Sequence, residues 1–225
     1  MKRRITKKKL IEYNRFLTKR DKAVIRSLLE CRYLNAKQVS RLHFGNSANH
    51  IAAIKSARST LRKLEDWGLV ALLERRVDNT KPGAAAAIWM LREAGAELLQ
   101  MEKTTPVKPR KYTQKTSYIF LKHTLAVSEL YTYLQTKTNL IKTEFEPLCW
   151  RGYRTVFGMN IVLKPDLYAV TADEDYEDHW FFEVDLNTEA PCRIIRKCES
   201  YGRYYLSGRE QKRLGVFPRV VWIVT

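Results

Sequence analysis

Three acidic residues in the second half of the chain have types and spacing that could support metal-dependent chemistry. Asp166 follows a proline, and Glu183 and Asp185 lie two residues apart in the apolar stretch 179–186. Residues two apart on a strand face the same side, where like charges repel unless a cation lies between them. Mg²⁺ is a suitable cation, because it binds one or two carboxylates together with waters and phosphate oxygens. Since such an ion activates water, the pattern predicts Mg²⁺ held by Asp166, Glu183 and Asp185 for phosphodiester cleavage.

A purely structural interpretation of the same acids stays open. They could form a satisfied buried network in which Lys197 or Arg193 supplies the counter-charge. A tyrosine nucleophile is a weaker interpretation, because the tyrosines at 201, 204 and 205 fall on an amphipathic helix without a histidine cluster nearby. Packing is the expected role of these tyrosines.

A second set of residues has the chemistry of DNA recognition. The segment 49–67 predicts a long helix with an apolar stripe at Ile51, Ile54, Ala57, Leu61 and Leu64. Its other faces carry basic groups suited to phosphates and short polar groups suited to base edges. The predicted DNA-binding residues are Ser47, His50, Lys55, Ser56, Arg58, Ser59, Arg62 and Lys63, with Arg75, Arg76 and Lys81 in a hairpin tip.

The elements around this helix indicate a winged helix-turn-helix. Helices are expected over 18–31 and 35–44, and strands over 69–73 and 86–91 enclose a polar tip from Glu74 to Gly83. Charge supports the assignment: residues 1–115 hold 27 Lys/Arg against 10 Asp/Glu, whereas residues 116–225 hold 14 of each. The basic half is therefore expected to bind double-stranded DNA. RNA is disfavoured, because no aromatic stacking platform is evident.

The neutral half predicts the order helix, three strands, helix, strand. The first helix covers 117–136 and carries Glu129, and the strands cover 140–150, 161–170 and 179–186, with turns at 151–158 and 171–178. A helix over 191–206, with a stripe at Ile194, Cys198, Tyr201 and Tyr205, precedes a last strand over 219–225. The strands flanking the acidic turn should pair and bring Asp166 near Glu183 and Asp185.

The fold class expected from these elements is α+β. The expected division is a basic arm at 1–17, a winged helix-turn-helix domain at 18–102, a basic linker at 103–116 and an α/β domain at 117–225. No run of about 18 apolar residues and no signal peptide is evident, so a cytoplasmic protein without a membrane partner is expected. The cysteines lack metal-site spacing and are expected to be free thiols.

The acid-bearing half resembles the restriction-endonuclease-like PD-(D/E)xK fold. Pro165-Asp166 and Glu183-Val184-Asp185 carry the likeness, which implies that Asp166 and Glu183 are metal ligands and that Glu129 matches an upstream helical acid. Asp185 stands where the motif has lysine, and Lys197 on the next helix could supply that charge. The implied catalytic set is Asp166, Glu183, Asp185, Lys197 and Glu129.

Residues 18–225 as a whole resemble the replication-relaxation family of plasmids and integrative conjugative elements. Most of the features that carry the resemblance lie in four short motifs. These are Leu61-Arg62-Lys63-Leu64, Gly68-Leu69-Val70, Leu91-x-x-Ala94-Gly95 and Lys164-Pro165-Asp166. The others are Phe182-Glu183-Val184-Asp185 with Thr188-Glu189, and Lys197-x-x-x-Tyr201.

Three functions follow as hypotheses. The first is a DNA-binding protein acting in replication initiation or relaxosome assembly of a mobile element, with the nuclease-like domain as a scaffold or dimer surface. The second is a Mg²⁺-dependent endonuclease or nickase, and the third a transcription regulator. Relaxosome or replication proteins and a second copy of the chain are the expected protein partners.

Overall fold

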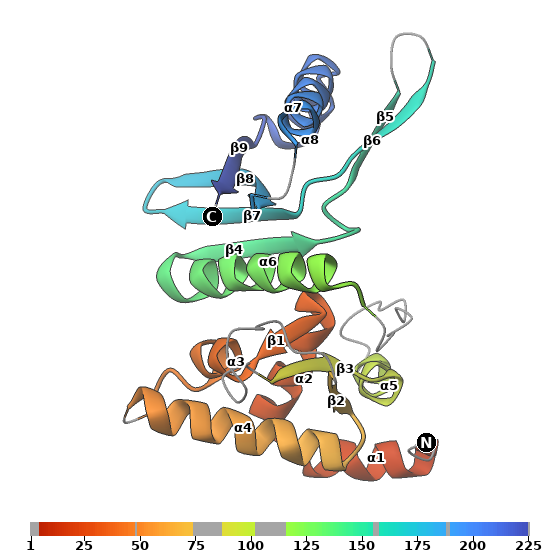
Figure 1. The fold of residues 1–225 in the computed structure, drawn as a ribbon, viewed down its shortest axis with the longest axis vertical. Coiled ribbons are helices and arrows are strands. Elements are labelled where there is room, and N and C mark those ends of the chain that lie inside the picture. Colours follow the sequence, from red (N-terminus) through yellow and green to blue (C-terminus); the bar gives the residue numbers. More distant parts are fainter. Residues whose placement is uncertain are drawn as a thin grey trace. The chain divides into compact units, whose positions relative to one another are not determined.

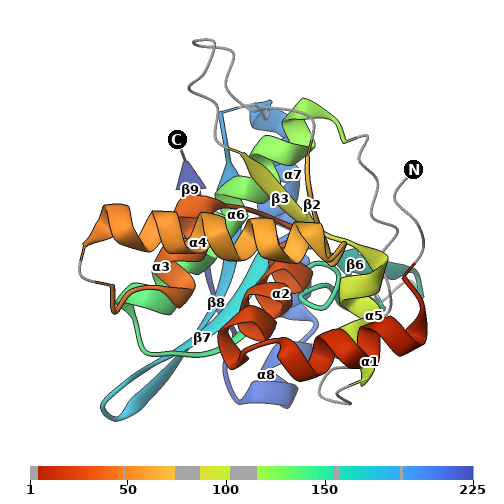
Figure 2. The same cartoon turned by 90° about the horizontal axis from the view of Figure 1, so that it is seen from below.

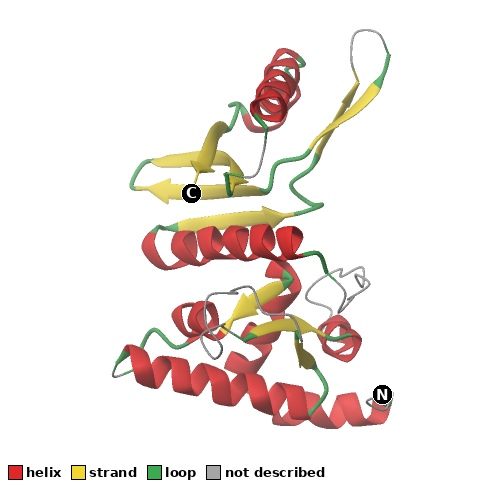
Figure 3. Ribbon diagram, in the orientation of Figure 1, coloured by secondary structure: helices red, strands yellow, loops and turns green. Residues whose placement is uncertain are grey.

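The computed structural model of the chain combines helices and sheets, which confirms the α+β class (Figures 1 and 3). It describes residues 5–47, 49–73, 87–101, 116–154, 158–187 and 190–224. The chain divides into two compact units, Met1–Thr132 and Tyr133–Thr225. Most of the expected linker, residues 103–115, lies outside the described residues. Among the described residues, every helix is too short or too polar to pass through a lipid bilayer.

The N-terminal unit contains the helices that the sequence predicts over 18–31, 35–44 and 49–67. They are α2, α3 and α4, and a further helix, α1, lies in the segment expected to be a basic arm. The elements are α1 (Lys7–Phe16), α2 (Lys19–Cys31), β1 (Tyr33–Asn35), α3 (Ala36–His43), α4 (His50–Asp66), β2 (Val70–Leu72), β3 (Ile88–Leu91), α5 (Glu93–Met101) and α6 (Tyr118–Lys137).

Capping boxes fix where α2 and α3 begin. The Thr18 hydroxyl accepts the Asp21 N–H at 3.1 Å, and the Asp21 carboxylate accepts the Thr18 N–H at 2.9 Å. Asn35 and Gln38 exchange the equivalent bonds at 3.0 Å each. These reciprocal bonds satisfy N–H groups that the first helical turn leaves without partners, so both start points are encoded locally.

A three-stranded antiparallel sheet, in the order β1-β3-β2, accompanies these helices. The predicted strands over 69–73 and 86–91 are confirmed as β2 and β3. The sequence did not predict β1, because three residues are too few to show a strand period. The expected hairpin tip, from Glu74 to Gly83, lies outside the described residues.

Helix α4 crosses α3 and α2 along one side of the unit (Figure 2). Its buried residues are Ala53, Ala57, Leu61 and Leu64. The prediction that Ile51 belongs to this stripe was wrong, since Ile51 is 79% exposed. With 3.6 residues per turn, Ile51 points roughly 120° away from the centre of the buried stripe, and Ile54 on its margin is half-buried.

The first turns of α6 belong to the N-terminal unit. Leu121 is fully buried among residues of β1 and β3. The Ser128 hydroxyl donates to the Tyr33 carbonyl at 3.0 Å and is also near the Cys31 carbonyl at 3.4 Å. These contacts explain why the two units divide within α6, after Thr132.

The C-terminal unit is built on a four-stranded sheet in the order β4-β7-β8-β9, in which β9 runs parallel to β8. The elements are β4 (Leu140–Phe145), β5 (Arg151–Arg154), β6 (Asn160–Leu163), β7 (Leu167–Asp173), β8 (Tyr176–Asp185), α7 (Pro191–Leu206), α8 (Arg209–Leu214) and β9 (Arg219–Val224). β5 and β6 form a separate two-stranded hairpin.

Two predictions of strand extent in this unit were wrong. The strand predicted over 140–150 ends at Phe145, and β5 lies where a turn was expected at 151–158. The strand predicted over 161–170 is divided into β6 and β7. Pro165 lies at the break, and its missing N–H cannot join a ladder. As a result, Asp166 lies at the start of β7 rather than inside a strand.

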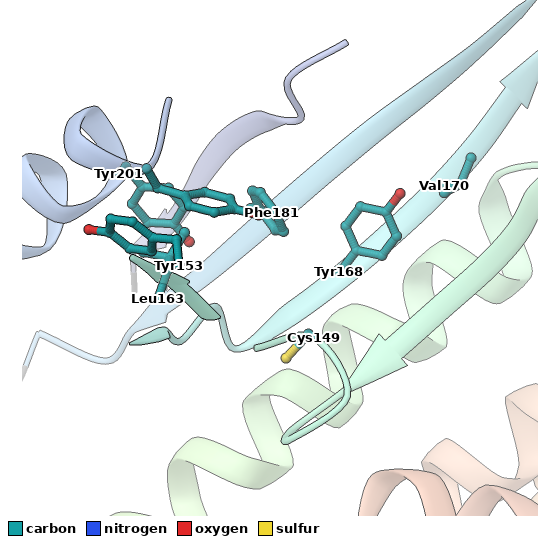
Figure 4. Packing of buried hydrophobic residues seen from close by; sticks show 8 residues of the cluster. Cys149, Tyr153, Leu163, Tyr168, Val170, Phe181 and Tyr201 are labelled. Carbon is teal, nitrogen blue, oxygen red and sulfur yellow. The ribbon is translucent and has the colours of Figure 1, made fainter. Parts of the chain in front are cut away.

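Helix α7 covers the core of the C-terminal unit with a stripe that differs from the predicted one. Tyr201 and Tyr204 are buried, whereas Cys198 and Tyr205, which were expected in the stripe, are exposed. Figure 4 shows the Tyr201 and Phe181 rings close together, with centroids 5.9 Å apart. The stripe is rotated because Lys197, rather than Cys198, faces the sheet. The cysteines, Cys31, Cys149, Cys192 and Cys198, are free, as expected.

An ion pair between α2 and α4 gives the first testable prediction. The Lys63 ammonium lies 2.6 Å from the Asp21 carboxylate, whose side chain is only 3% exposed. Lys63→Ala would leave that carboxylate buried without its cation, so we expect the free energy of unfolding to fall by roughly 1–3 kcal/mol, less than for a fully buried pair because Lys63 is partly exposed.

Urea denaturation measures this change, with Lys55→Ala on the exposed face of α4 as the control. The control should stay within about 0.5 kcal/mol of the unsubstituted protein. Equal effects of the two substitutions would contradict a structural role for Lys63.

Candidate functional site

The predicted DNA-binding residues of α4 lie mainly on its solvent-facing side. The exposed members are His50, Lys55, Ser56, Arg58, Ser59 and Arg62. A shallow groove follows this side, and its lining includes Lys55, Arg58 and Arg62. Arg75, Arg76 and Lys81 lie outside the described residues. The structure thus brings three exposed basic side chains together along one helix face, and Lys63 and the acidic Asp66 also line the groove.

Lys63 has a different environment from the other basic residues of α4. It is half-buried, and its ammonium is held between both oxygens of the Asp21 carboxylate at 2.6 Å. Burial would raise the pKa of Asp21, but the hydrogen bonds from Lys63 and Thr18 outweigh burial and lower it. The charge of Lys63 is therefore largely engaged within the N-terminal unit.

The first turn of α4 presents an apolar group beside polar ones. Ile51 lines the same groove as Arg58 and Arg62. Asn49 caps the start of the helix, and its side-chain carbonyl accepts the Ala52 N–H at 2.8 Å. Ser47, in the turn before the helix, is half-buried. The sequence pattern placed Ile51 in the apolar stripe rather than among the DNA-binding residues, because isoleucine usually occupies a core position.

The acidic residues Asp166, Glu183 and Asp185 are all buried in the C-terminal unit, Asp166 immediately before β7 and the other two on β8. The ladder pairs Leu167 with Phe182, which places Asp166 beside Glu183. One Asp166 oxygen accepts the Val184 N–H at 2.8 Å. The expected proximity of Asp166 and Glu183 is therefore confirmed, and Asp185 lies two residues further along β8.

Glu183 is the most deeply buried of the three, with 1% of its surface exposed. Lys197 of α7 forms an ion pair with one of its oxygens, and the Tyr201 hydroxyl donates to the other at 2.5 Å. Burial raises the pKa of Glu183 to about 7, although Lys197 acts in the opposite direction. A carboxyl that titrates near neutrality can both donate and accept a proton at physiological pH.

The carboxylates match only part of what a metal site requires. Mg²⁺ takes one or two carboxylates and completes its shell with waters and phosphate oxygens, and Asp166 with Glu183 satisfies that number. Within the described ranges, however, no group of three His, Cys, Asp or Glu side chains is arranged to hold an ion. The oxygens of Glu183 are already engaged by Lys197 and Tyr201, so Mg²⁺ would have to compete with Lys197.

Glu129, the predicted helical acid, is engaged within the N-terminal unit. Arg41 of α3 lies 2.5 Å from its carboxylate, and the Gln38 side chain donates to it at 3.2 Å. These bonds hold α6 against α3. The structure thus gives Glu129 a structural partner, and its catalytic role stays a prediction.

A scan against protein-family models matched residues 25–220 to the replication-relaxation family. The chain belongs to the replication-relaxation family. No curated protein and no solved structure matched it. The resemblance noted in the sequence is confirmed at the level of the family. Because the match extends from α2 into β9, both the α4 face and the carboxylates lie inside the span that defines a replication-relaxation protein.

This replication-relaxation protein also contains a buried ionic network that the sequence did not reveal. Arg151 of β5 lies 2.7 Å from both Glu144 and Glu210, and Glu210 is fully buried. Tyr204 donates to Glu210 at 3.0 Å, and Arg213 lies 2.7 Å from it. The partners are separated by up to 59 residues along the chain, so no local pattern could indicate the network.

The Glu183 environment gives the second testable prediction. We expect its carboxyl to titrate near pH 7 in an NMR titration, and Lys197→Met to raise the pKa further because a nearby cation favours the ionised form. Arg196→Met, on the exposed side of α7, should leave the titration unchanged. A Glu183 titration near 4.5 in the unsubstituted protein would contradict the conclusion that burial outweighs the Lys197 ion pair.

Stability should follow the same titration. The folded state keeps the Glu183 proton to a higher pH than the unfolded chain, in which the pKa is about 4.5. The stabilisation from protonated Glu183 is therefore fully present below about pH 4.5 and is lost as the pH rises through about 7. Glu183→Gln should remove this part of the pH dependence in urea denaturation.

Proposed function

We propose that the chain is a double-stranded DNA-binding protein that acts in the replication or relaxation of a plasmid or other mobile element. The observation that carries the proposal is the exposed basic face of α4, with Lys55, Arg58 and Arg62 along one groove. Membership of the replication-relaxation family supports the process. Relaxosome or replication proteins and a second copy of the chain are the proposed protein partners.

The arrangement around α4 supports a winged helix-turn-helix mode of binding. The order α2, β1, α3, α4, β2, β3 with a β1-β3-β2 sheet is the order such a domain requires. In this mode α4 is the recognition helix, whose N-terminal residues contact base edges in the major groove. Ser47 and His50 lie at that end, and Lys55, Arg58 and Arg62 follow along the helix for the phosphates.

Ile51 fits this mode as a specificity residue. Its side chain is 79% exposed in the first turn of α4. Packing within the described part of the protein therefore does not account for an isoleucine at this position. In the major groove the thymine methyl group is an apolar feature that an aliphatic side chain can contact. We therefore assign Ile51 to contact with a thymine in the preferred site.

In this proposal, the excess positive charge of the N-terminal half provides the affinity for DNA. Residues 1–115 carry 27 Lys/Arg and 10 Asp/Glu. Each basic residue that neutralises a phosphate releases a condensed counterion, so affinity depends steeply on salt.

The third testable prediction concerns the α4 face. Arg58→Ala combined with Arg62→Ala should weaken duplex binding and lower the slope of log affinity against log salt by about 1 for each lost phosphate contact. Fluorescence anisotropy with a labelled duplex at several salt concentrations measures both quantities. Lys122→Ala, an exposed substitution on α6, is the matched control, and equal binding by the two variants would move the contact surface away from α4.

A second candidate function is a Mg²⁺-dependent nickase or endonuclease. The specific observation in its favour is that Asp166, Glu183 and Lys197 meet at one place, as a PD-(D/E)xK-like site requires. Asp166 and Glu183 would hold the ion, which would activate water towards a phosphodiester. Lys197 would supply the positive charge that Asp185 cannot, and Tyr201 would orient Glu183.

The fourth testable prediction separates a nuclease from a scaffold. If the second function holds, supercoiled plasmid carrying the cognate site should be nicked in Mg²⁺ and left intact with a chelator. Asp166→Ala should abolish nicking, whereas Asp175→Ala in the exposed acidic turn should retain it. Absence of nicking by the unsubstituted protein would favour the scaffold, and nicking by the Asp166→Ala variant would remove the assigned site.

A further inference from the structure

A pocket of about 360 Å³ in the C-terminal unit is lined mainly by cations. It lies where β5 meets α7 and α8, and its lining residues are separate from the Asp166 and Glu183 cluster. The residues lining it are Trp150, Arg151, Gly152, Tyr204, Arg209, Lys212 and Arg213. Four of these seven residues carry a positive charge.

Hydrogen bonds hold three of these cations in place. The Arg209 guanidinium donates to the Gly152 carbonyl at 2.8 Å. Arg213 donates to Glu210 at 2.9 and 2.7 Å, and Arg151 donates to Glu210 and Glu144 at 2.7 Å each. Because these side chains are already ordered, an anion that binds them loses little additional rotamer freedom.

The carboxylates around the pocket do not cancel its charge. The two oxygens of Glu210 are engaged by Arg151, Tyr204 and Arg213, and the residue is fully buried. Arg209, Lys212 and Arg213 are exposed at the mouth. Among the described residues, Lys212 has no ion-pair partner. The side chain of Arg209 donates to the Gly152 carbonyl rather than to a carboxylate. The mouth is therefore positive.

This concentration of positive charge contrasts with the unit as a whole. Residues 133–225 contain 13 Lys/Arg and 13 Asp/Glu. Five of the acids lie between Asp173 and Asp178, around the turn that joins β7 to β8. Five of the 13 acids thus lie around one turn and four of the 13 cations line one pocket, and this separation of charge favours an anion at the pocket.

We propose that this pocket binds a phosphate of the nucleic-acid backbone, so that the C-terminal unit makes its own contact with DNA. The inference rests on the proposed DNA-binding function. Arginine guanidinium groups match phosphate oxygens through paired N–H donors, and Arg209, Lys212 and Arg213 are accessible to a backbone phosphate. The pocket volume suits one phosphate with its sugar rather than a protein segment.

The fifth testable prediction is that Arg209→Gln combined with Lys212→Gln weakens duplex binding by the full chain. The slope of log affinity against log salt should fall by up to about 2 between about 50 and 200 mM salt, measured by fluorescence anisotropy. The matched control is Arg219→Gln, because Arg219 lies 3.3 Å from Asp178 beside the acidic turn, where phosphate is repelled. The conservative pair Arg209→Lys with Lys212→Arg should restore binding.

The possible outcomes are distinct. Equal binding by the double variant and the Arg219→Gln control, with the unsubstituted protein binding duplex, would overturn this pocket assignment and leave the proposed function intact. Failure of the unsubstituted protein to bind duplex would overturn both. Unfolding midpoints show whether the double variant is folded, and a folded variant with a reduced slope supports the assignment.

An NMR experiment distinguishes a phosphate of the DNA backbone from free inorganic phosphate as the ligand of the pocket. Duplex should shift the backbone amide of Gly152 and the indole N–H of Trp150 in the full chain. The same shifts with inorganic phosphate alone, and none with duplex, would assign the pocket to a free anion and overturn the proposal.

Discussion

Charge that is buried must be paired, and this constraint organises both units of the protein. Asp21, Glu183 and Glu210 are buried carboxylates, and each one is paired with a cation from a different element. Removing such a cation would leave a charge in a poorly solvated place, at a cost that is smaller where the cation is partly exposed, as Lys63 is. The pairs therefore hold α2 to α4, β8 to α7, and α8 to β5.

The same constraint separates the basic residues into two groups. Lys63, Lys197 and Arg151 are engaged by internal carboxylates, whereas Lys55, Arg58 and Arg62 face solvent along α4. Cations of the second kind, which face solvent, can neutralise the phosphates of a polyanion without destabilising the fold. This division explains how a chain with 41 Lys/Arg and 24 Asp/Glu can use some cations for folding and keep others for binding.

Much of the fold could be predicted from the sequence because its signals are local. The Thr18–Asp21 and Asn35–Gln38 pairs mark helix starts within four residues, and periodicity identified α4 and α7. The predicted pairing of the strands that flank the acidic turn correctly placed Asp166 beside Glu183, and the suggestion that Lys197 supplies a cation agrees with its ion pair to Glu183.

The remaining features depend on partners that lie far apart in the chain. Ile51 resembled a core residue, and only the orientation of α4 exposes it. Lys63 resembled a phosphate ligand until Asp21, 42 residues away, was found beside it. The Arg151–Glu210 pair and the strand β1 likewise arise from tertiary contacts. Local patterns predict elements, but they do not show which charge on an element has a buried partner.

Hydrogen exchange of the full chain with and without a duplex tests the central claim most directly, because it reports where DNA lies without any substitution. The account predicts slower exchange at the start of α4, from residue 49 onwards, with no change at the acidic turn between β7 and β8. Unchanged exchange throughout α4 at saturating duplex would contradict it.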